Sequence, residues 1–252
     1  MVDIDSLIQE AERLPLSGWD FGPIEGRWQR GQPSWDLRMI TRERFRSASS
    51  LLDLGTGGGE FLSSLQPLPA HTWATEGYGP NIAVARARLE PLGVKVLPIK
   101  ADQRIDFPSN TIDIVFCRHE GFDPREVLRV LRPGGSLITQ QVGERSYEDL
   151  HRRFATPPEP PHNHVESLER FAEEVVAAGL VIEKAKDSSF PERFLDVGAV
   201  VYFLRAAPWE VPGFSAERHR AILKDIQSEI DRVGYWELEA HRLLIIATKP
   251  RK

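Results

Sequence analysis

The sequence has few of the features that mark secreted, membrane-spanning or nucleic-acid-binding proteins. Its 252 residues include one cysteine, Cys117, so no disulfide can form within the chain and a reducing cytoplasm is the expected location. The first ten residues are acidic and lack a positive region followed by an apolar run, so neither a signal peptide nor a membrane anchor is expected there. The net charge of -5 provides no basic footprint for a duplex, so a nucleic-acid partner is not expected.

Two phosphate-binding motifs are also missing from the most glycine-rich stretch, residues 51–62. Glu60 stands where a dinucleotide fingerprint requires its third glycine, and the Gly-Lys-Ser/Thr of a phosphate-cradling loop is absent. The stretch instead combines a short apolar strand, a turn with four glycines in five positions, and the start of a helix. Because glycine has no Cβ, such a turn lets the backbone pass close under a ligand.

The motif D-x-G-x-G-x-G, formed by Asp53, Gly55, Gly57 and Gly59, resembles the first motif of the class I S-adenosylmethionine-dependent methyltransferases. A second segment, residues 129–137, is similar to the later R-x-L-x-P-G-G signature of that family. The resemblance covers roughly residues 50–186 in motif order, together with a closing strand near the C-terminus. Several motifs in the family's order are more specific than any one of them alone.

The resemblance implies an α/β fold with a doubly wound, mostly parallel seven-stranded sheet. We expect residues 1–49 to form an N-terminal helical lid and residues 50–252 to form the S-adenosylmethionine-binding methyltransferase domain. Within that domain, residues 187–235 are expected to be a substrate-side insertion before the last strand. The near-continuous apolar run at residues 112–117 is typical of a central parallel strand that is buried on both faces.

The cofactor implied by the resemblance is S-adenosylmethionine, with S-adenosylhomocysteine as its product. This cofactor carries an ammonium and a sulfonium and no pyrophosphate, so a carboxylate is a better neighbour than a lysine. Glu76 ends a predicted strand and is expected to accept hydrogen bonds from both ribose hydroxyls, although a plain surface acid is the alternative. Asp102 is expected to reach the adenine, with an ordinary turn aspartate as the alternative. The expected cofactor-binding residues are Asp53, Gly55, Thr56, Gly57, Gly59, Glu76, Gly77, Asp102, Gln103, Arg118 and Trp35.

His119 follows the predicted central strand, at the edge where an open parallel sheet binds its ligands. An ordinary histidine pKa near 6.5 suits removal of a proton, so His119 is the candidate catalytic base, with a packing histidine as the alternative. Gln140, Gln141, His162 and His164 are candidate substrate-binding residues. No cysteine or carboxylate cluster accompanies the two loop histidines, so no metal site is expected. Trp35 is either a lid contact or part of a packed appendage.

The predicted reaction is methyl transfer to an oxygen or nitrogen of a small-molecule acceptor. One alternative is an RNA-modifying methyltransferase in which arginines between residues 38 and 46 contact phosphates. Another is a protein of the same fold that binds S-adenosylmethionine without catalysis. The sequence identifies neither the acceptor nor the oligomeric state.

Overall fold

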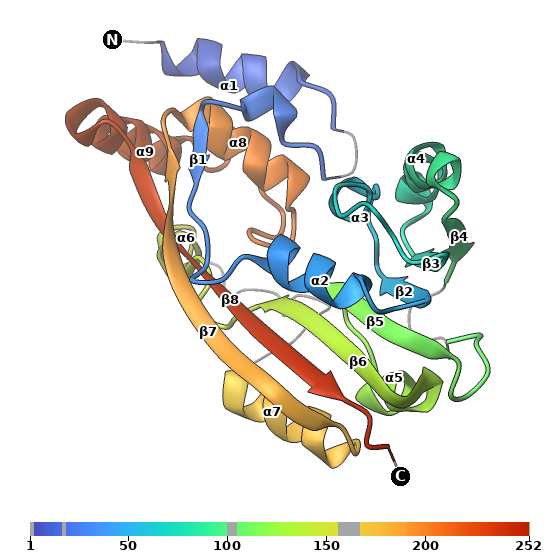
Figure 1. Cartoon of the computed structure of the whole chain (residues 1–252). Helices are drawn as coiled ribbons and strands as arrows, with labels where there is room; N and C mark the ends of the chain where they lie inside the picture. Colours follow the sequence, from blue (N-terminus) through green and yellow to red (C-terminus); the bar gives the residue numbers. More distant parts are fainter. Residues whose placement is uncertain (1–2, 17–18, 100–104, 156–166, 252) are drawn as a thin grey trace. The chain divides into compact units, whose positions relative to one another are not determined.

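A computed structural model describes residues 3–16, 19–99, 105–155 and 167–251 (Figure 1). Four expected site residues, Asp102, Gln103, His162 and His164, lie outside these ranges. The chain divides into two compact units. The first, here called the aromatic unit, comprises residues 1–33, 145–161 and 189–241, and the second, here called the glycine-loop unit, comprises residues 34–144, 162–188 and 242–252.

The glycine-loop unit is built on parallel strands. Successive neighbours pair in parallel across β4, β3, β2, β5 and β6, and β6 then pairs antiparallel with residues 242–248 of β8. The strands are β2 (Ser50–Leu54), β3 (His71–Glu76), β4 (Lys95–Pro98), β5 (Ile112–Arg118), β6 (Leu131–Val142) and β8 (Trp236–Thr248). The chain adds β3 and β4 on one side of β2 and then crosses over to add β5 and β6 on the other side. The direction of strand addition therefore changes between β2 and β5. The carboxyl ends of β2 and β5 therefore meet where such a sheet binds ligands.

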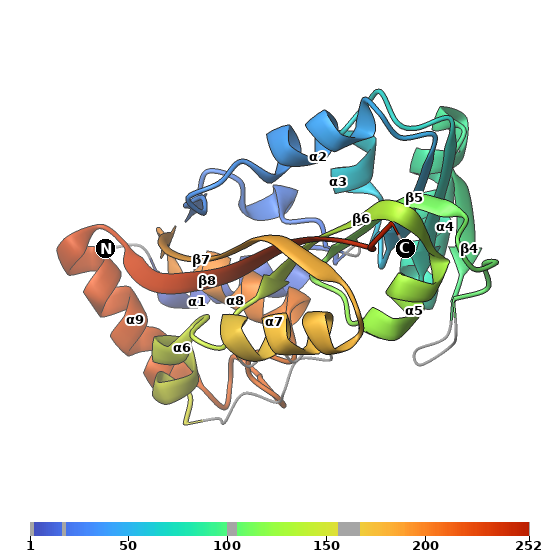
Figure 2. The same ribbon diagram turned by 60° about the horizontal axis from the view of Figure 1, so that its bottom comes forward.

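Helices cover both faces of these strands, as Figure 2 shows for α2 and α3 on one side and α5 and α7 on the other. Adjacent residues of β2 point to opposite faces of the sheet, and each face has its own apolar core. Leu51 lies in the core with residues of the helices at 37–45, 60–63 and 79–89 (α2, α3 and α4), and Leu52 lies in the core with residues of the helices at 124–130 and 168–177 (α5 and α7). The expected doubly wound α/β arrangement is thereby confirmed for this unit. Its helices are α2 (Leu37–Phe45), α3 (Glu60–Ser63), α4 (Gly79–Leu89), the short η2 (Glu90–Leu92), α5 (Pro124–Val130) and α7 (Leu168–Ala177).

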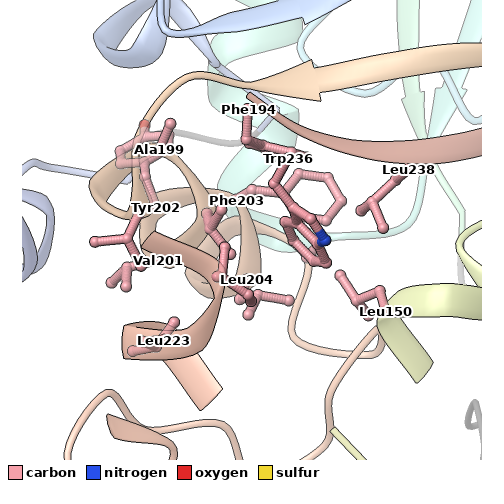
Figure 3. Close-up of a cluster of buried hydrophobic side chains, with 14 of the residues drawn as sticks. Leu150, Phe194, Ala199, Val201, Tyr202, Phe203, Leu204, Leu223, Trp236 and Leu238 are labelled. Carbon is pink, nitrogen blue, oxygen red and sulfur yellow. The ribbon is translucent and has the colours of Figure 1, made fainter. Parts of the chain in front are cut away.

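The aromatic unit is held together by a large apolar core around α8 (Figure 3). Helix α8 spans Val197–Ala206, and nine of its ten residues are buried. None of the helices in the described ranges, α8 included, has the length and apolarity needed to span a membrane. The other elements of this unit are α1 (Ile4–Arg13), η1 (Gly22–Ile24), β1 (Trp28–Arg30), α6 (Glu148–Arg153), the second half of β7 (Val181–Phe194), α9 (Arg220–Val233) and the start of β8.

The expected count of seven strands is wrong for the described residues, which form an eight-stranded sheet in the order β1-β7-β8-β6-β5-β2-β3-β4. The additional strand is β1, whose three residues pair antiparallel with residues 192–194 of β7. Trp28 of β1 stacks on Phe194 with a ring-centroid distance of 5.5 Å. Three residues are too few to show the period-two pattern by which a strand is recognised, so the pairing depends on this tertiary packing. The predicted lid and insertion boundaries stay predictions.

Gly135, at the sharp turn into the packed part of β6, gives the first testable prediction. A Cβ there would lie 2.9–3.0 Å from the backbone oxygens of Arg132, Asp113 and Ile112. We expect Gly135→Ala to destabilise the protein by about 1–3 kcal/mol, because backbone atoms must shift to accept the methyl group. The measurement is urea unfolding, with Gly79→Ala as the matched control, since nothing lies within 4 Å of a Cβ at Gly79. Equal stability of the two variants would contradict the prediction.

Candidate active site

The glycine loop between β2 and α3 has a backbone conformation that requires glycine. Gly55, Gly57 and Gly59 have φ values of 66°, 63° and 80°, in the left-handed region that other residues rarely adopt. The loop is tied to β3, because the Thr56 amide donates to the Thr75 carbonyl at 2.9 Å and the Gly55 amide donates to Thr75 Oγ1 at 3.2 Å. The sequence therefore builds a fixed backbone cradle at the carboxyl end of the parallel strands.

Asp53 lies at the base of this cradle and is only 3% exposed. Burial raises the pKa of its carboxyl group to about 7, and the nearby Thr56 side chain and the positive charge of Arg118 counteract this only in part. The negative charge of Glu76 adds to the increase. Burial disfavours the ionised form of a carboxyl group, and a cation that binds beside the group stabilises that ionised form.

Glu76 ends β3 and is likewise buried, at 5% exposure. Its Oε1 accepts a hydrogen bond of 2.7 Å from the Tyr78 amide. Burial raises the pKa of Glu76, as does the negative charge of Glu120, while the backbone amides of Tyr78, Gly57 and Gly77 lower it. Glu76 and the glycine loop therefore share one polar region, as the sequence predicts.

Arg118, the last residue of β5, adds a positive charge to this region. Its guanidinium carbon lies 4.5 Å from the centre of the Phe61 ring, and Phe61 in turn stacks on Phe116. Burial lowers the pKa of Arg118 to about 10, and the charge of Asp53 opposes this decrease. Arg118 therefore remains charged at neutral pH, close to the two buried acids.

His119 is linked to Trp35 through Gln140. The Trp35 indole N–H donates to Gln140 Oε1 at 2.9 Å, and Gln140 Nε2 lies 3.2 Å from His119 Nε2. Burial, together with the positive charges of Arg118 and Arg242, lowers the pKa of His119 well below its usual value. The ring is therefore neutral at pH 7. Whether it acts as a base stays a prediction.

Gln141 points to the loop after β5. Its Nε2 donates to the Glu120 carbonyl at 3.0 Å and to Thr139 Oγ1 at 2.9 Å, and the residue is 1% exposed. The Cys117 thiol also contacts the Glu120 carbonyl, and burial raises the pKa of that thiol, so Cys117 is not a thiolate nucleophile. The two neighbouring glutamines thus hold the backbone of residue 120 and the ring of residue 119.

The structure brings most of the described candidate residues together at one edge of the parallel strands. Asp53, Glu76 and Arg118 lie in the last two residues of β2, β3 and β5, and the glycine loop and His119 follow β2 and β5. Glu120 was not selected from the sequence, although it directly follows Arg118 and His119. A Cβ at Gly55 would lie 2.3 Å from Glu120 Cγ, so this side chain lies against the glycine loop. The described residues hold no group of three or more histidine, cysteine, aspartate or glutamate side chains that could bind a metal ion.

Comparison with known proteins agrees with this geometry. Residues 52–139 match the family model described as a methyltransferase domain. Uncharacterized methyltransferases of Mycobacterium tuberculosis and Mycobacterium bovis are 32% identical over 123 residues, a match that covers 46% of this chain and 49% of each relative. Residues 52–139 are therefore similar to a methyltransferase domain. These matches support the expected methyltransferase family, for which S-adenosylmethionine is the expected cofactor.

Solved structures of similar fold extend beyond the matched domain. The YcgJ protein of Bacillus subtilis has a TM-score of 0.61 at 18% identity, with 86% of this chain and 99% of that chain covered. The [4+2]-cyclase SpnF has a TM-score of 0.55 at 18% identity, with 99% of this chain and 93% of that chain covered. These matches show the fold alone. The match to the curated mycobacterial relatives spans about half of their length, so the reaction of the whole protein has to be argued from its site.

The residues at this edge fit the expected cofactor, S-adenosylmethionine. The left-handed glycines leave the loop backbone open to close approach. Asp53 and Glu76 are buried acids with raised pKa values, and both groups gain from a cationic ligand. Arg118 supplies the opposite charge nearby. Together these side chains suit a zwitterionic ligand with an additional positive centre.

The raised pKa of Asp53 predicts how stability depends on pH. Folded Asp53 titrates at about 7, whereas an unfolded aspartate titrates near 3.9. Below about pH 4 both states hold the proton, and as the pH rises toward 7 the unfolded state ionises first. This group therefore lowers the free energy of unfolding by about 1 kcal/mol per pH unit between pH 4 and 7.

Asp53→Asn should remove that pH dependence, because an amide does not titrate. We expect the stability difference, variant minus wild type, to increase by about 2 kcal/mol from pH 5 to pH 7. Urea unfolding of the ligand-free protein at pH 5, 6, 7 and 8 measures this stability difference. Glu90→Gln is the control, because the Glu90 side chain is half-exposed. A difference that stays constant with pH would show that Asp53 ionises normally.

Proposed function

We propose that this protein transfers a methyl group from S-adenosylmethionine to an oxygen or nitrogen of a small-molecule acceptor. The observation that carries the proposal is the arrangement of Asp53, Glu76 and Arg118 around the left-handed glycine loop. Each charged part of the cofactor has an opposite partner among these residues. The ammonium and sulfonium match the negative charge of Asp53, and the amino-acid carboxylate matches Arg118.

Each residue has a proposed role at this site. Asp53 and the glycine loop, with Thr56, hold the amino-acid half of the cofactor, and Glu76, with Gly77, binds the ribose hydroxyls. The Tyr78 amide already fixes one oxygen of the Glu76 carboxylate, which orients the group before the ligand arrives. Asp102 and Gln103 remain proposed for the adenine, Trp35 for the cofactor side, and Gln140, Gln141, His162 and His164 for the acceptor side.

The chain's contribution to catalysis is proposed to be orientation and exclusion of water. When bound, S-adenosylmethionine supplies a methyl group on a sulfonium. Asp53 and the glycine loop would hold the cofactor that supplies this methyl group, and the acceptor would have to lose a proton as it takes the methyl. The protein must hold the acceptor in line with the breaking bond, and such positioning can supply most of the rate. The lid at residues 1–49, the insertion at residues 187–235 and a cytoplasmic location belong to the same proposal.

An RNA substrate is less favoured by the contacts of the N-terminal arginines. Arg38 and Arg42 contact Ser64, and Arg44 contacts Ser136 and Glu183. These guanidinium groups therefore already donate hydrogen bonds within the glycine-loop unit, and the charge of Arg44 is paired with that of Glu183. Salt-dependent binding of RNA would revive this alternative.

Glu76→Gln gives the direct test of the cofactor site. The substitution keeps the shape of the side chain and removes its charge, so we expect the Kd for S-adenosylhomocysteine to rise by about 10- to 100-fold, the usual value of a hydrogen bond to a charged group. Calorimetric titration measures the Kd. Glu90→Gln, on the neighbouring η2, is the matched control and should bind like the wild type.

A screen with methyl-labelled S-adenosylmethionine then separates the reactions. Label transferred to hydroxyl or amine compounds supports the proposed function, and label transferred to RNA supports the alternative. Tight binding without transfer to any acceptor would indicate a non-catalytic protein. A wild type that does not bind S-adenosylhomocysteine would refute the proposal as a whole.

A further inference from the structure

The hydrogen bonds that join Trp35, Gln140 and His119 determine where the imidazole carries its proton. The three residues come from separate elements of the glycine-loop unit: Trp35 precedes α2, Gln140 lies in β6 and His119 follows β5. Trp35 and Gln140 are 8% and 7% exposed. Their contacts are direct, at 2.9 Å from the indole nitrogen to Gln140 Oε1 and 3.2 Å from Gln140 Nε2 to His119 Nε2.

The direction of each hydrogen bond follows from the chemistry of its partners. An indole N–H can only donate, so the atom of Gln140 that faces Trp35 must be the amide oxygen. The amide nitrogen of Gln140 then faces His119, and an amide nitrogen can also only donate. His119 Nε2 must therefore be the acceptor, which requires that this nitrogen carries no proton. In a neutral ring, the proton is then on Nδ1.

Two further features keep the ring in this state. The His119 amide donates to the Gln140 carbonyl at 2.9 Å, with His119 at a φ of 61°, so Gln140 fixes both the backbone and the side chain of this residue. Gln140 itself is paired with Arg118 of β5 and Leu244 of β8. The positive charges of Arg118 and Arg242 lower the pKa of His119, so both oppose a second proton on its ring.

We propose that Trp35 and Gln140 are positioning residues that hold His119 as the Nδ1–H tautomer, with its Nε2 lone pair engaged by Gln140. This inference rests on the proposed function for its meaning, since His119 stands at the edge where the acceptor is expected. It changes the role of His119 from the expected base to a hydrogen-bonding residue. The acceptor then loses its proton to a group other than His119 Nε2.

Nitrogen NMR of protein labelled with ¹⁵N-histidine tests the tautomer. The His119 signals are those that a His119→Gln variant lacks among the seven histidines. In the wild type, Nδ1 should resonate as a protonated nitrogen and Nε2 as an unprotonated one. In Gln140→Glu, a carboxylate faces Nε2, so Nε2 should become protonated and the imidazole pKa should rise by about one unit or more.

Trp35→Phe is the second variant, in case Gln140→Glu does not fold. It removes the indole N–H that fixes the amide, so both His119 nitrogens should show partial protonation. Trp73→Phe, which alters another partly buried tryptophan of the same unit, should leave the His119 signals unchanged. A protonated Nε2 in the wild type would overturn the inference, as would His119 signals that neither Trp35→Phe nor Gln140→Glu alters.

Because the NMR readout requires no methyl transfer, an Nδ1–H signal in a protein that does not bind S-adenosylhomocysteine would refute the proposed function and leave the tautomer assignment standing.

Discussion

The burial of two carboxylates against a glycine loop is the constraint on which the rest of the site depends. Asp53 and Glu76 lie near the carboxyl ends of neighbouring parallel strands and are almost fully removed from water. Removing a charge from water is costly unless an opposite charge or several hydrogen bonds compensate. The protein compensates in part, through Arg118 and the backbone amides near Glu76. The remaining demand for positive charge is what makes a cationic cofactor a suitable ligand.

The parallel sheet explains why these groups meet. β3 and β5 flank β2, so Asp53 lies beside Ala74 on one side and Phe116 on the other. The polar residues that end these strands then lie at a single edge. Helices on both faces bury the strands themselves, so that edge is where polar chemistry can reach a ligand. The Trp35, Gln140 and His119 contacts extend the same edge toward β6.

Much of this could be predicted from sequence because the signals are local. The glycine spacing, the acid at the end of residues 71–76 and the apolar run at residues 112–117 each define an element without knowledge of its neighbours. The strand β1 could not be predicted, because its three residues are paired through Trp28 and Phe194, which are 166 positions apart in the chain. The hydrogen-bond partners of Gln140, Trp35 and His119, could not be predicted either. Two amides at the end of a strand do not reveal that one of them faces an indole. Glu120 carried a usable signal, an acid directly after Arg118 and His119 at a central strand's end.

The fold leaves the reaction open, because solved structures of this fold include one, SpnF, that is named as a cyclase. A crystal structure of the protein with S-adenosylhomocysteine is therefore the most direct measurement of the central claim. We predict ligand density along residues 55–59, with both ribose hydroxyls on Glu76 and the amino-acid end beside Asp53 and Arg118. Ligand bound elsewhere, or a glycine loop without ligand at saturating concentration, would contradict this prediction.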